Sequence, residues 1–309
     1  MKQLKIGNIK LKNPLFLAPM VDVTDLPHRL ICRKAGAAMA YTEMLYISSI
    51  LHKNKHTQNL MKTTKEDAPL GIQIAGNSAE EFKKFIPYAK KYDLTDINCG
   101  CPSIKITGNQ SGSYLLKNPE KIGKMIRTLK QAGLTVTAKI RLGFKKNNVL
   151  KVSKEIEKAG ADALTLHARL AIHGRSVPAD WNWIKKVKKS IGIPVIGNGD
   201  IFSGKDAEKM LEIADGAMLA RAAIGDPLIF QRILKYLKTK KEPKFNFKQN
   251  IKLFQEYLAL EKKYSLVDIP RIKYLGSNFI KNIHGASSLR NQLIQLKSFG
   301  EIERFIKRL

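Results

Sequence analysis

Eight short apolar segments, rich in β-branched residues, recur over the first 220 residues of the chain. Longer segments with the periodicity of amphipathic helices, such as 78–92, 118–133 and 149–160, separate most of them. This alternation predicts eight strand–helix units and is typical of a (β/α)8 TIM barrel, an α/β fold. A doubly wound sheet is the alternative, but no Gly-x-Gly-x-x-Gly motif follows the first strand. The predicted strands are 15–19, 40–44, 70–76, 95–100, 136–141, 163–168, 194–199 and 215–220.

The alternation of strands and helices stops near residue 237. Residues 238–246 are basic and polar and contain a proline, which indicates a linker. Residues 247–309 have helical periodicity and contain more Lys and Arg than Asp and Glu. We therefore predict a barrel domain over 1–237, the linker, and a small all-helical domain over 247–309. This last domain either binds a polyanion or simply packs on the barrel.

The charge of the chain is strongly positive. Its 55 Lys and Arg residues exceed its 26 Asp and Glu residues, which gives a formal net charge of +29. Such an excess causes self-repulsion and favours a polyanionic partner. Nucleic acid is favoured over an anionic membrane, because no strongly amphipathic basic helix begins the sequence. A lysine-rich surface that reflects biased composition is the alternative.

Other sequence features bear on the compartment. No run of 18 apolar residues is present, and the N-terminal segment lacks the apolar core and cleavage site of a signal peptide. The three cysteines, Cys32, Cys99 and Cys101, form neither a disulfide framework nor a set with zinc-site spacing. We expect a cytoplasmic protein, and a monomer, with no membrane segment and no metal.

Polar residues occur at nearly every predicted strand end. The carboxyl ends of the strands form the active-site face of a TIM barrel, so these residues should converge there. Lys139 lies within an otherwise apolar strand, and an unpaired buried lysine is costly, so it should face an anion or an electron-rich ligand. A flavin edge is one such ligand, and Schiff-base chemistry is the alternative. The strand-end residues are Pro19, Met20, Glu43, Gln73, Asn98, Lys139, Arg141, His167, Asn198 and Arg221.

Two late loops have the features of a phosphate site. Residues 197–201 follow the seventh predicted strand, and residues 219–227 follow the eighth. Both contain small residues that let backbone N–H groups approach an anion, and Arg221 adds a positive charge. This is the usual phosphate position in a TIM barrel, for either a phosphorylated substrate or a phosphorylated cofactor. Glycines that only form tight turns are the alternative.

Cys99 and Cys101 lie in the segment DINCGCPSIKITGNQSGSYLL at 96–116. One intervening residue is too few for the usual Cys-x-x-Cys redox pair. We interpret Cys99 as a packing residue at the end of a strand. The following loop contains Gly108 and Gly112.

Several linked motifs in this chain resemble those of the tRNA-dihydrouridine synthases. They occur in the expected order through about residues 13–230, and the C-terminal IPRIKYLGSNFIKNIHGA resembles the helical domain of that family. The barrel motifs are APMVDVTDLPHR, IQIAG, DINCGCPSIKITGNQSGSYLL, KIRLG, LTLHAR, PADW, IPVIGNGDI and GAMLARAAIGDP.

The resemblance implies an FMN-dependent enzyme that reduces the 5,6 double bond of specific uridines in tRNA, with NADPH or NADH as transient reductant. It also implies that a hydride passes from flavin N5 to uracil C6 and that Cys101 protonates C5. A thiol suits this role, because it is protonated at neutral pH and can still give up its proton.

The resemblance also implies which residues bind the cofactor and the RNA. Asn98, Lys105 and Arg169 are implied near the substrate, and the basic helical domain offers Arg271 and Lys273, with Lys281 and Arg290, as RNA contacts. One departure is Ala220, where the family usually has glycine. The implied cofactor-binding residues are Pro19, Met20, Val21, Gln73, Lys139, His167, Asn198, Gly199, Asp200, Ala220 and Arg221.

Two other functions compete with this one. A flavin barrel acting on a free pyrimidine, as in the dihydroorotate dehydrogenases, is disfavoured by the basic C-terminal domain. An RNA-binding protein without flavin chemistry is disfavoured because Gln73, Cys101, Lys139 and His167 are all present.

Overall fold

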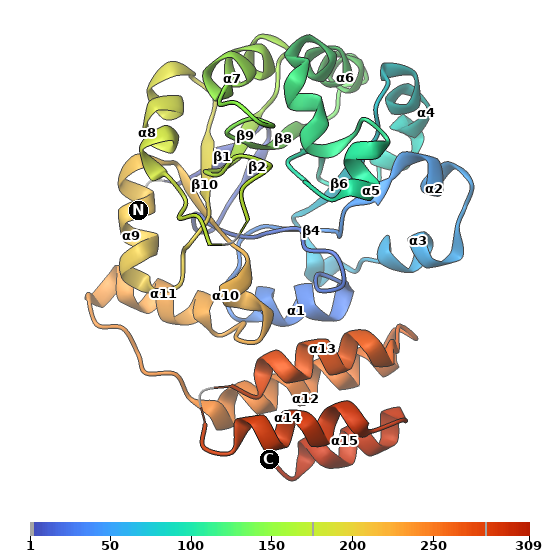
Figure 1. The fold of residues 1–309 in the computed structure, drawn as a ribbon, viewed down its shortest axis with the longest axis vertical. Coiled ribbons are helices and arrows are strands. Elements are labelled where there is room, and N and C mark those ends of the chain that lie inside the picture. The colour runs from blue at the N-terminus through green and yellow to red at the C-terminus, as the bar shows by residue number, and fades with distance from the viewer. Residues whose placement is uncertain (1–2, 175, 282) are drawn as a thin grey trace.

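The computed structural model describes residues 3–174, 176–281 and 283–309, so the first two residues of the predicted barrel domain lie outside the description. Its main sheet follows the order β3-β11-β10-β9-β8-β7-β6-β4, with every pair parallel and with β5 also paired to β6. Hydrogen bonds of 2.9 Å from Leu17 N–H to Met39 O and from Ala38 N–H to Leu15 O join β3 to the residues before β4. The predicted (β/α)8 barrel is thereby confirmed (Figure 1). The strands are β3 (Leu15–Leu17), β4 (Ala40–Tyr41), β5 (Leu45–Tyr46), β6 (Leu70–Ala75), β7 (Leu94–Cys99), β8 (Val136–Arg141), β9 (Ala163–His167), β10 (Val195–Asn198) and β11 (Gly216–Leu219).

The helices around the barrel form where caps and apolar faces coincide. In α6 (Pro119–Gln131), the side chain of Asn118 accepts a hydrogen bond from the backbone N–H of Lys121, and Pro119 occupies the first turn. Its apolar face of Ile122, Met125, Ile126 and Leu129 is fully buried, and each such side chain contributes about 1.5–3 kcal/mol. The other barrel helices are α1 (Leu26–Lys34), α2 (Ile47–Leu51), α3 (Lys55–Leu60), α4 (Ala79–Ala89), α5 (Ile104–Gly108), α7 (Val149–Lys158), α8 (Trp181–Ser190), α9 (Gly204–Ile213), α10 (Arg221–Ile224) and α11 (Ile229–Thr239), with 3-10 turns at η1 (Lys65–Asp67) and η2 (Gly112–Lys117).

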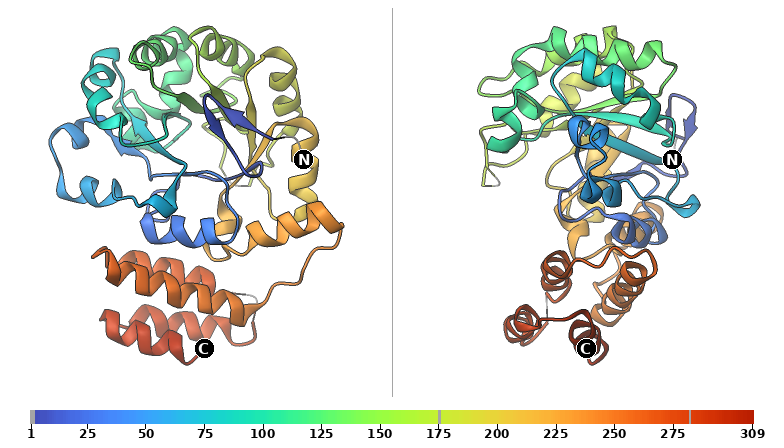
Figure 2. Two further views of the ribbon diagram at one scale, coloured as in Figure 1. Left: turned by 180° about the vertical axis from the view of Figure 1, so that it is seen from behind. Right: turned by 90° about the vertical axis from the view of Figure 1, so that its right-hand side faces the viewer.

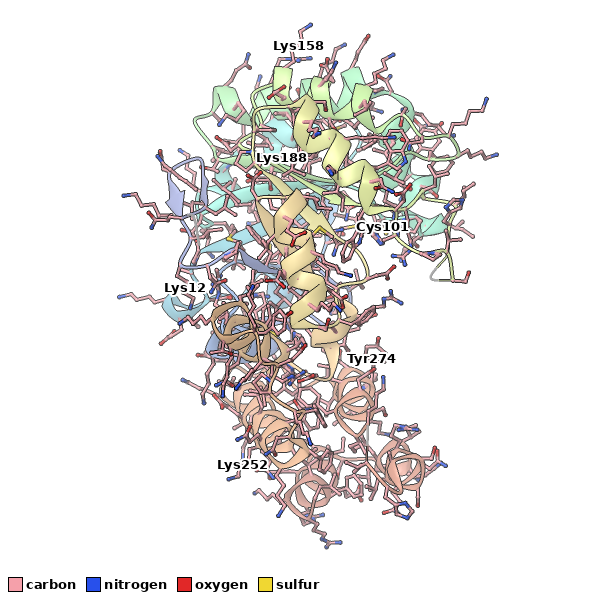
Figure 3. All side chains as sticks on the ribbon, turned by 90° about the vertical axis from the view of Figure 1, so that its left-hand side faces the viewer. Lys12, Cys101, Lys158, Lys188, Lys252 and Tyr274 are labelled. Carbon is pink, nitrogen blue, oxygen red and sulfur yellow. The ribbon has the colours of Figure 1, made fainter. Side chains whose placement is uncertain are left out.

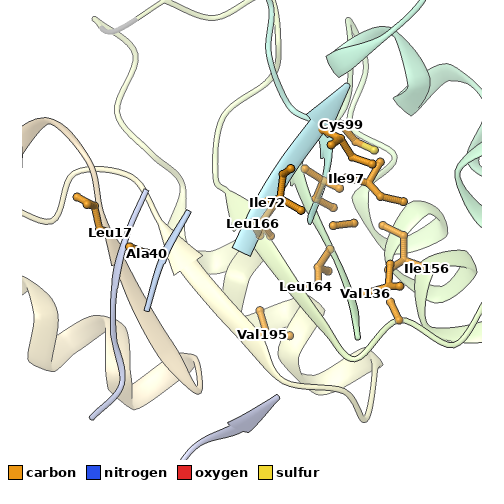
Figure 4. Close-up of a cluster of buried hydrophobic side chains, with 14 of the residues drawn as sticks. Leu17, Ala40, Ile72, Ile97, Cys99, Val136, Ile156, Leu164, Leu166 and Val195 are labelled. Carbon is orange, nitrogen blue, oxygen red and sulfur yellow. The ribbon is translucent and has the colours of Figure 1, made fainter. Parts of the chain in front are cut away.

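A short antiparallel hairpin, β1 (Lys5–Ile6) and β2 (Ile9–Lys10), precedes the barrel and was not predicted from the sequence. Leu4, Ile6 and Leu11 pack in one cluster with barrel-interior residues such as Phe16 and Met218. The hairpin covers the end of the barrel opposite the carboxyl ends of the strands (Figure 2). Figure 4 shows part of the separate core between strands and helices, where Cys99 and Ile97 lie near Ile156.

The C-terminal region is helical, as predicted, and lies beside the barrel (Figure 1). Its helices are α12 (Phe247–Lys263), α13 (Ile269–Phe279), α14 (Ala286–Gln295) and α15 (Phe299–Lys307). Helix α11 extends to Thr239, two residues beyond the predicted barrel limit, so the connection without helix or strand begins at residue 240. Phe254, Tyr257 and Phe279 form an aromatic core, in which the ring centroid of Phe254 lies 5.5 Å from that of Tyr257 and 4.7 Å from that of Phe279.

The helical domain packs directly on the barrel. Val23 and Ile31 of the barrel belong to the same buried cluster as the helical core. Arg271 of α13 is only 5% exposed, and its guanidinium contacts Asp25 at 3.1 Å and Glu43 at 3.2 Å. Arg271 is thus largely buried in ion pairs with two carboxylates of the barrel, and its contact with RNA stays a prediction. Within the described ranges, no helix is long and apolar enough to cross a membrane.

Candidate active site

A cleft of about 470 Å³ lies at the carboxyl ends of the strands. Beside it is a smaller cavity of about 190 Å³, and Pro19, Lys139, Arg141 and His167 line both spaces. A cavity of about 610 Å³ near Lys12 and Lys263 is larger, but it gathers no strand-end residues. The larger cleft also has Met20, Val21, Arg169, Asn198, Gly199, Asp200, Ala220 and Arg221 in its lining, and the smaller cavity has Val21, Gln73, Asn98 and Cys101.

Lys139 is the central cation of the site, and its neighbours are also basic. Its Nζ donates a hydrogen bond of 3.1 Å to Oδ1 of Asn198. Burial, together with the charge of Arg141, lowers the pKa of Lys139 to about 8, although Asp96 opposes this shift. Burial and Arg169 lower the pKa of Arg141 to about 10. A cavity with this concentration of positive charge is suited to an anionic or electron-rich ligand.

Asp200 organises the loop after β10. Its carboxylate accepts hydrogen bonds from Arg169 at 2.5 Å, from Arg221 at 2.7 Å and from the backbone N–H of Ala179 at 2.9 Å. Burial acts against ionisation, but the bond from Arg169 and these other donors together lower the pKa of Asp200. Asp200 therefore aligns the two arginines, and a bound anion would be held by the arginines and not by this carboxylate.

Arg169 has few free donors for a substrate. Its Nε donates to the backbone oxygen of Val177 at 2.5 Å, its Nη1 lies 2.9 Å from Nε2 of His167, and its Nη2 contacts Asp200. The residue is 4% exposed. Arg169 is thus placed to hold His167 and Asp200 in position. Arg221 differs, because only one of its amino groups is bound to Asp200 and its side chain is 35% exposed.

His167 is neutral in this environment. Burial, followed by the charges of Lys139, Arg141, Arg169 and Arg221, lowers the pKa of its imidazole to about 2. Since Nη1 of Arg169 can only donate, Nε2 of His167 is the acceptor and Nδ1 carries the proton. His167 can therefore offer a hydrogen bond from Nδ1, but it cannot serve as a cationic acid at neutral pH.

A buried polar network leads from the barrel interior to Cys101. Oδ2 of Asp96 accepts a bond of 2.7 Å from Gln73, whose Oε1 accepts a bond of 2.8 Å from Asn98. Oδ1 of Asn98 then accepts the backbone N–H groups of Gly100 at 3.2 Å and Cys101 at 2.9 Å. Asn98 thereby fixes the turn that carries Cys101, a role that the sequence prediction did not include.

Asp96 was missed in the sequence analysis, although an acidic residue within the apolar run TDINCG was a usable signal. The side chain is 1% exposed and also accepts a bond of 2.6 Å from Thr137. Burial raises its pKa to about 6, while the bonds from Gln73 and Thr137 act in the opposite direction. Asp96 orients the amide of Gln73 and lies too deep to contact a ligand in the cleft.

The two cysteines of the loop have separate environments. Cys99 is fully buried in the core (Figure 4), and burial raises its pKa strongly, which confirms the packing role predicted for it. Cys101 is partly exposed and lines the smaller cavity. Its backbone oxygen accepts a 2.9 Å bond from the N–H of Ser113, so both backbone groups of Cys101 are held.

The remaining predicted residues lie farther from the cavities. Lys105 is exposed on α5, three residues after Pro102, which lines both cavities. Lys273 donates a bond of 2.7 Å to the backbone oxygen of Ile294. Lys281 is exposed and bonds to Asn278 at 2.6 Å, whereas Arg290 is half-buried and bonds to Ile280 O at 3.0 Å.

A closed parallel barrel with a cationic cleft and a partly exposed thiol at the carboxyl ends of its strands defines a (β/α)8-barrel enzyme. The chain belongs to the dihydrouridine synthase family, because the family model for dihydrouridine synthase (Dus) matches residues 16–307. It is 33% identical to a probable tRNA-dihydrouridine synthase of Aquifex aeolicus over 96% of both chains. It is also 37% identical to tRNA-dihydrouridine synthase B of Vibrio cholerae, over 76% of this chain and 75% of that protein.

Solved structures support the fold. The old yellow enzyme homologue from Zymomonas mobilis matches with a TM-score of 0.54 at 12% identity, over 80% of this chain and 95% of that chain. At this level of identity the likeness concerns the barrel architecture alone.

Proposed function

We propose that the protein reduces the 5,6 double bond of specific uridines in tRNA to give dihydrouridine, with FMN as cofactor and NADPH or NADH as reductant. The observation that carries the proposal is that Lys139 lines both cavities. The larger one contains the loop after β10 and Arg221, the predicted phosphate site, and the smaller one contains Cys101. Family membership and the names of the relatives support the tRNA substrate. We further propose that the enzyme acts in the cytoplasm as a monomer.

The donors of the larger cleft fit a phosphorylated flavin. Lys139 makes one hydrogen bond within the protein, to Asn198, which leaves two ammonium donors for the electron-rich edge of a ring. Arg221 keeps an amino group free for a phosphate. Gly199 has a φ of +117°, and a Cβ at this position would lie 2.9 Å from the Cβ of Ala179. Only glycine therefore fits here without strain, which keeps the backbone of this loop open to a ligand. A bound flavin would supply the hydride for uracil C6.

Cys101 is proposed as the general acid. Its Sγ holds the proton that uracil C5 must receive, and the polar network from Asp96 through Asn98 fixes its backbone. Lys139 and Arg141 line the same smaller cavity as this thiol, so a base held by these cations lies beside Cys101. His167 is neutral and is assigned to binding, not to proton transfer.

The positive charge of the protein favours binding of the tRNA backbone. A uridine in folded tRNA must leave its stack to enter the site, which costs a few kcal/mol. Contacts with the RNA backbone offset that cost, and the net charge of +29 favours them. A free pyrimidine would need no such surface, which disfavours an enzyme of free bases.

An anaerobic experiment tests the proposal. The protein is purified with its flavin absorbance, fully reduced, and mixed with unmodified tRNA or with free uridine. We expect tRNA, but not free uridine, to restore the oxidised absorbance and to yield dihydrouridine. Cys101→Ala should form little product, while Cys99→Ala serves as the matched control and should retain activity. If tRNA does not reoxidise the reduced flavin, the proposal that tRNA is the substrate is refuted. If the protein binds no flavin, the whole proposal is refuted.

A further inference from the structure

Three exposed apolar side chains, Val21, Phe202 and Tyr274, line the cleft. Among the described residues, nine large apolar side chains are exposed, and six of them lie in segments that follow the carboxyl ends of strands or on helix α13. Leu150, Val267 and Ile294 are the other three. Contiguous exposed apolar surface marks a binding site, whereas scattered residues do not. The six are Val21, Ile104, Ile172, Val177, Phe202 and Tyr274.

Two of the six are aromatic, and they come from different domains. Phe202 follows β10 of the barrel and is 49% exposed, and Tyr274 belongs to α13 of the helical domain and is 44% exposed. Both line the 470 Å³ cleft. Figure 3 shows Tyr274 at the barrel-facing edge of the helical domain, on the same side of the molecule as Cys101. The rim of the cleft is therefore built from both domains, with an exposed ring on each.

Cations accompany these rings. The guanidinium of Arg221 lies 5.2 Å from the ring centroid of Phe202. A further cavity of about 290 Å³ shares Phe202 and Arg221 with the cleft, and Phe245 and Lys281 also line it. Exposed rings beside positive charges are the means by which proteins hold unstacked nucleotides, with bases on the rings and phosphates on the cations.

We propose that Phe202 and Tyr274 are stacking platforms for the nucleotides that flank the reduced uridine in the RNA. This inference rests on the proposed function and adds a recognition surface to it. When the uridine leaves its stack, the bases on either side of it in the RNA lose a stacking partner. Aromatic rings at the rim of the cleft can stack on these bases and so stabilise the RNA conformation in which the uridine is turned out. The surface thus selects unpaired, loop-forming RNA, and its contribution to affinity is independent of the phosphate contacts.

The test measures the dissociation constant for unmodified tRNA at several salt concentrations. Stacking on one base predicts that Phe202→Ala and Tyr274→Ala each raise the dissociation constant about 5- to 150-fold with an unchanged salt slope. Tyr274→Phe should stay within about twofold of the wild type, because it keeps the ring. Lys281→Ala should reduce the salt slope by about one, as expected for a phosphate contact.

The matched control is Ile294→Ala, which removes a side chain that is 51% exposed on the same domain but absent from the cleft. It should leave tRNA affinity unchanged. Flavin content and the rate of flavin reduction by NADPH are measured on every variant and should equal those of the wild type.

Three results would overturn the inference. The first is an unchanged dissociation constant in both alanine variants. The second is loss of flavin, which would assign the rings to the cofactor. The third is slower reduction by NADPH, which would assign them to the dinucleotide. A wild-type protein that holds flavin but does not reduce tRNA would instead refute the proposed function, so the two failures are distinguishable.

Discussion

Replacing Arg271 by methionine should lower the free energy of unfolding by about 3–5 kcal/mol, the range measured when one partner of a buried ion pair is removed. Arg271 contacts Asp25 at 3.1 Å and Glu43 at 3.2 Å, and both carboxylate side chains are 2% exposed. Oε2 of Glu43 also accepts the backbone N–H of Asp22 at 2.8 Å, next to residues that line the cleft. The loss is a large fraction of the stability of a typical protein.

The effect of this substitution should depend on pH. Burial raises the pKa of Glu43 to about 7, although Arg271 acts to lower it. The folded protein thus binds the Glu43 proton more tightly than the unfolded chain, whose Glu has a pKa near 4.5. The tighter binding of the proton by Glu43 in the folded state stabilises the protein. This stabilisation is fully present below about pH 4.5 and is lost as the pH rises through about 7. Without Arg271 the pKa of Glu43 rises further, so the methionine variant should lose less stability at pH 6 than at pH 8.

Urea unfolding followed by circular dichroism at pH 6 and pH 8 provides the measurement. Glu43→Gln should reduce the pH dependence, and its combination with Arg271→Met should cost less than the sum of the two changes. Lys273→Ala on the same helix is the matched control and should change stability by at most about 0.5 kcal/mol. A loss below about 1 kcal/mol for Arg271→Met, equal at both pH values, is the behaviour of an exposed ion pair and would contradict its buried role.

Three further outcomes follow from the site. Asn98→Ala leaves the N–H groups of Gly100 and Cys101 unpaired, a cost of about 1–3 kcal/mol, so the rate of flavin reoxidation by tRNA should fall about 5- to 150-fold at unchanged flavin content. Because the pKa of His167 is about 2, this residue does not titrate between pH 5 and 7. The pH–rate profiles of the wild type and of His167→Asn should therefore have the same shape in this range. Flavin affinity of the wild type, measured by fluorescence titration, should fall as the pH rises through about 8, where Lys139 loses its proton. In Lys139→Met that affinity should be about tenfold or more weaker and independent of pH in this range.

The barrel could be predicted because its signal is local. Each strand of a parallel barrel is a continuous apolar run, and the predicted strand 136–141 coincides with β8. The predicted strand 40–44 matches the structure less well. Only Ala40–Tyr41 forms a strand there, β4, and the pairing with β6 resumes at β5, Leu45–Tyr46. The hairpin of β1 and β2 has two residues in each strand, which is too short for any periodic pattern.

The positions of the site residues were predictable for a related reason. Barrel topology brings every strand end to one rim, so polar residues there converge without any knowledge of their partners. Gln73, Lys139 and His167 were found in this way, whereas Cys101 was implied by the family resemblance, and all four line the smaller cavity. Their hydrogen-bond partners were not predictable, because those depend on strand register and on side-chain direction.

Arg271 illustrates the limit of an argument from charge. Net charge identifies a polyanionic partner for the surface as a whole, but it does not separate exposed cations from those that pair internally. The carboxylates that bind Arg271 lie at Asp25 and Glu43, more than 220 residues earlier in the chain. Only the packing of α13 against the barrel joins them, and the same packing brings Tyr274 to the cleft. On this helix the buried arginine pairs with carboxylates of the barrel, and the exposed ring of Tyr274 is the group that we propose to stack on RNA.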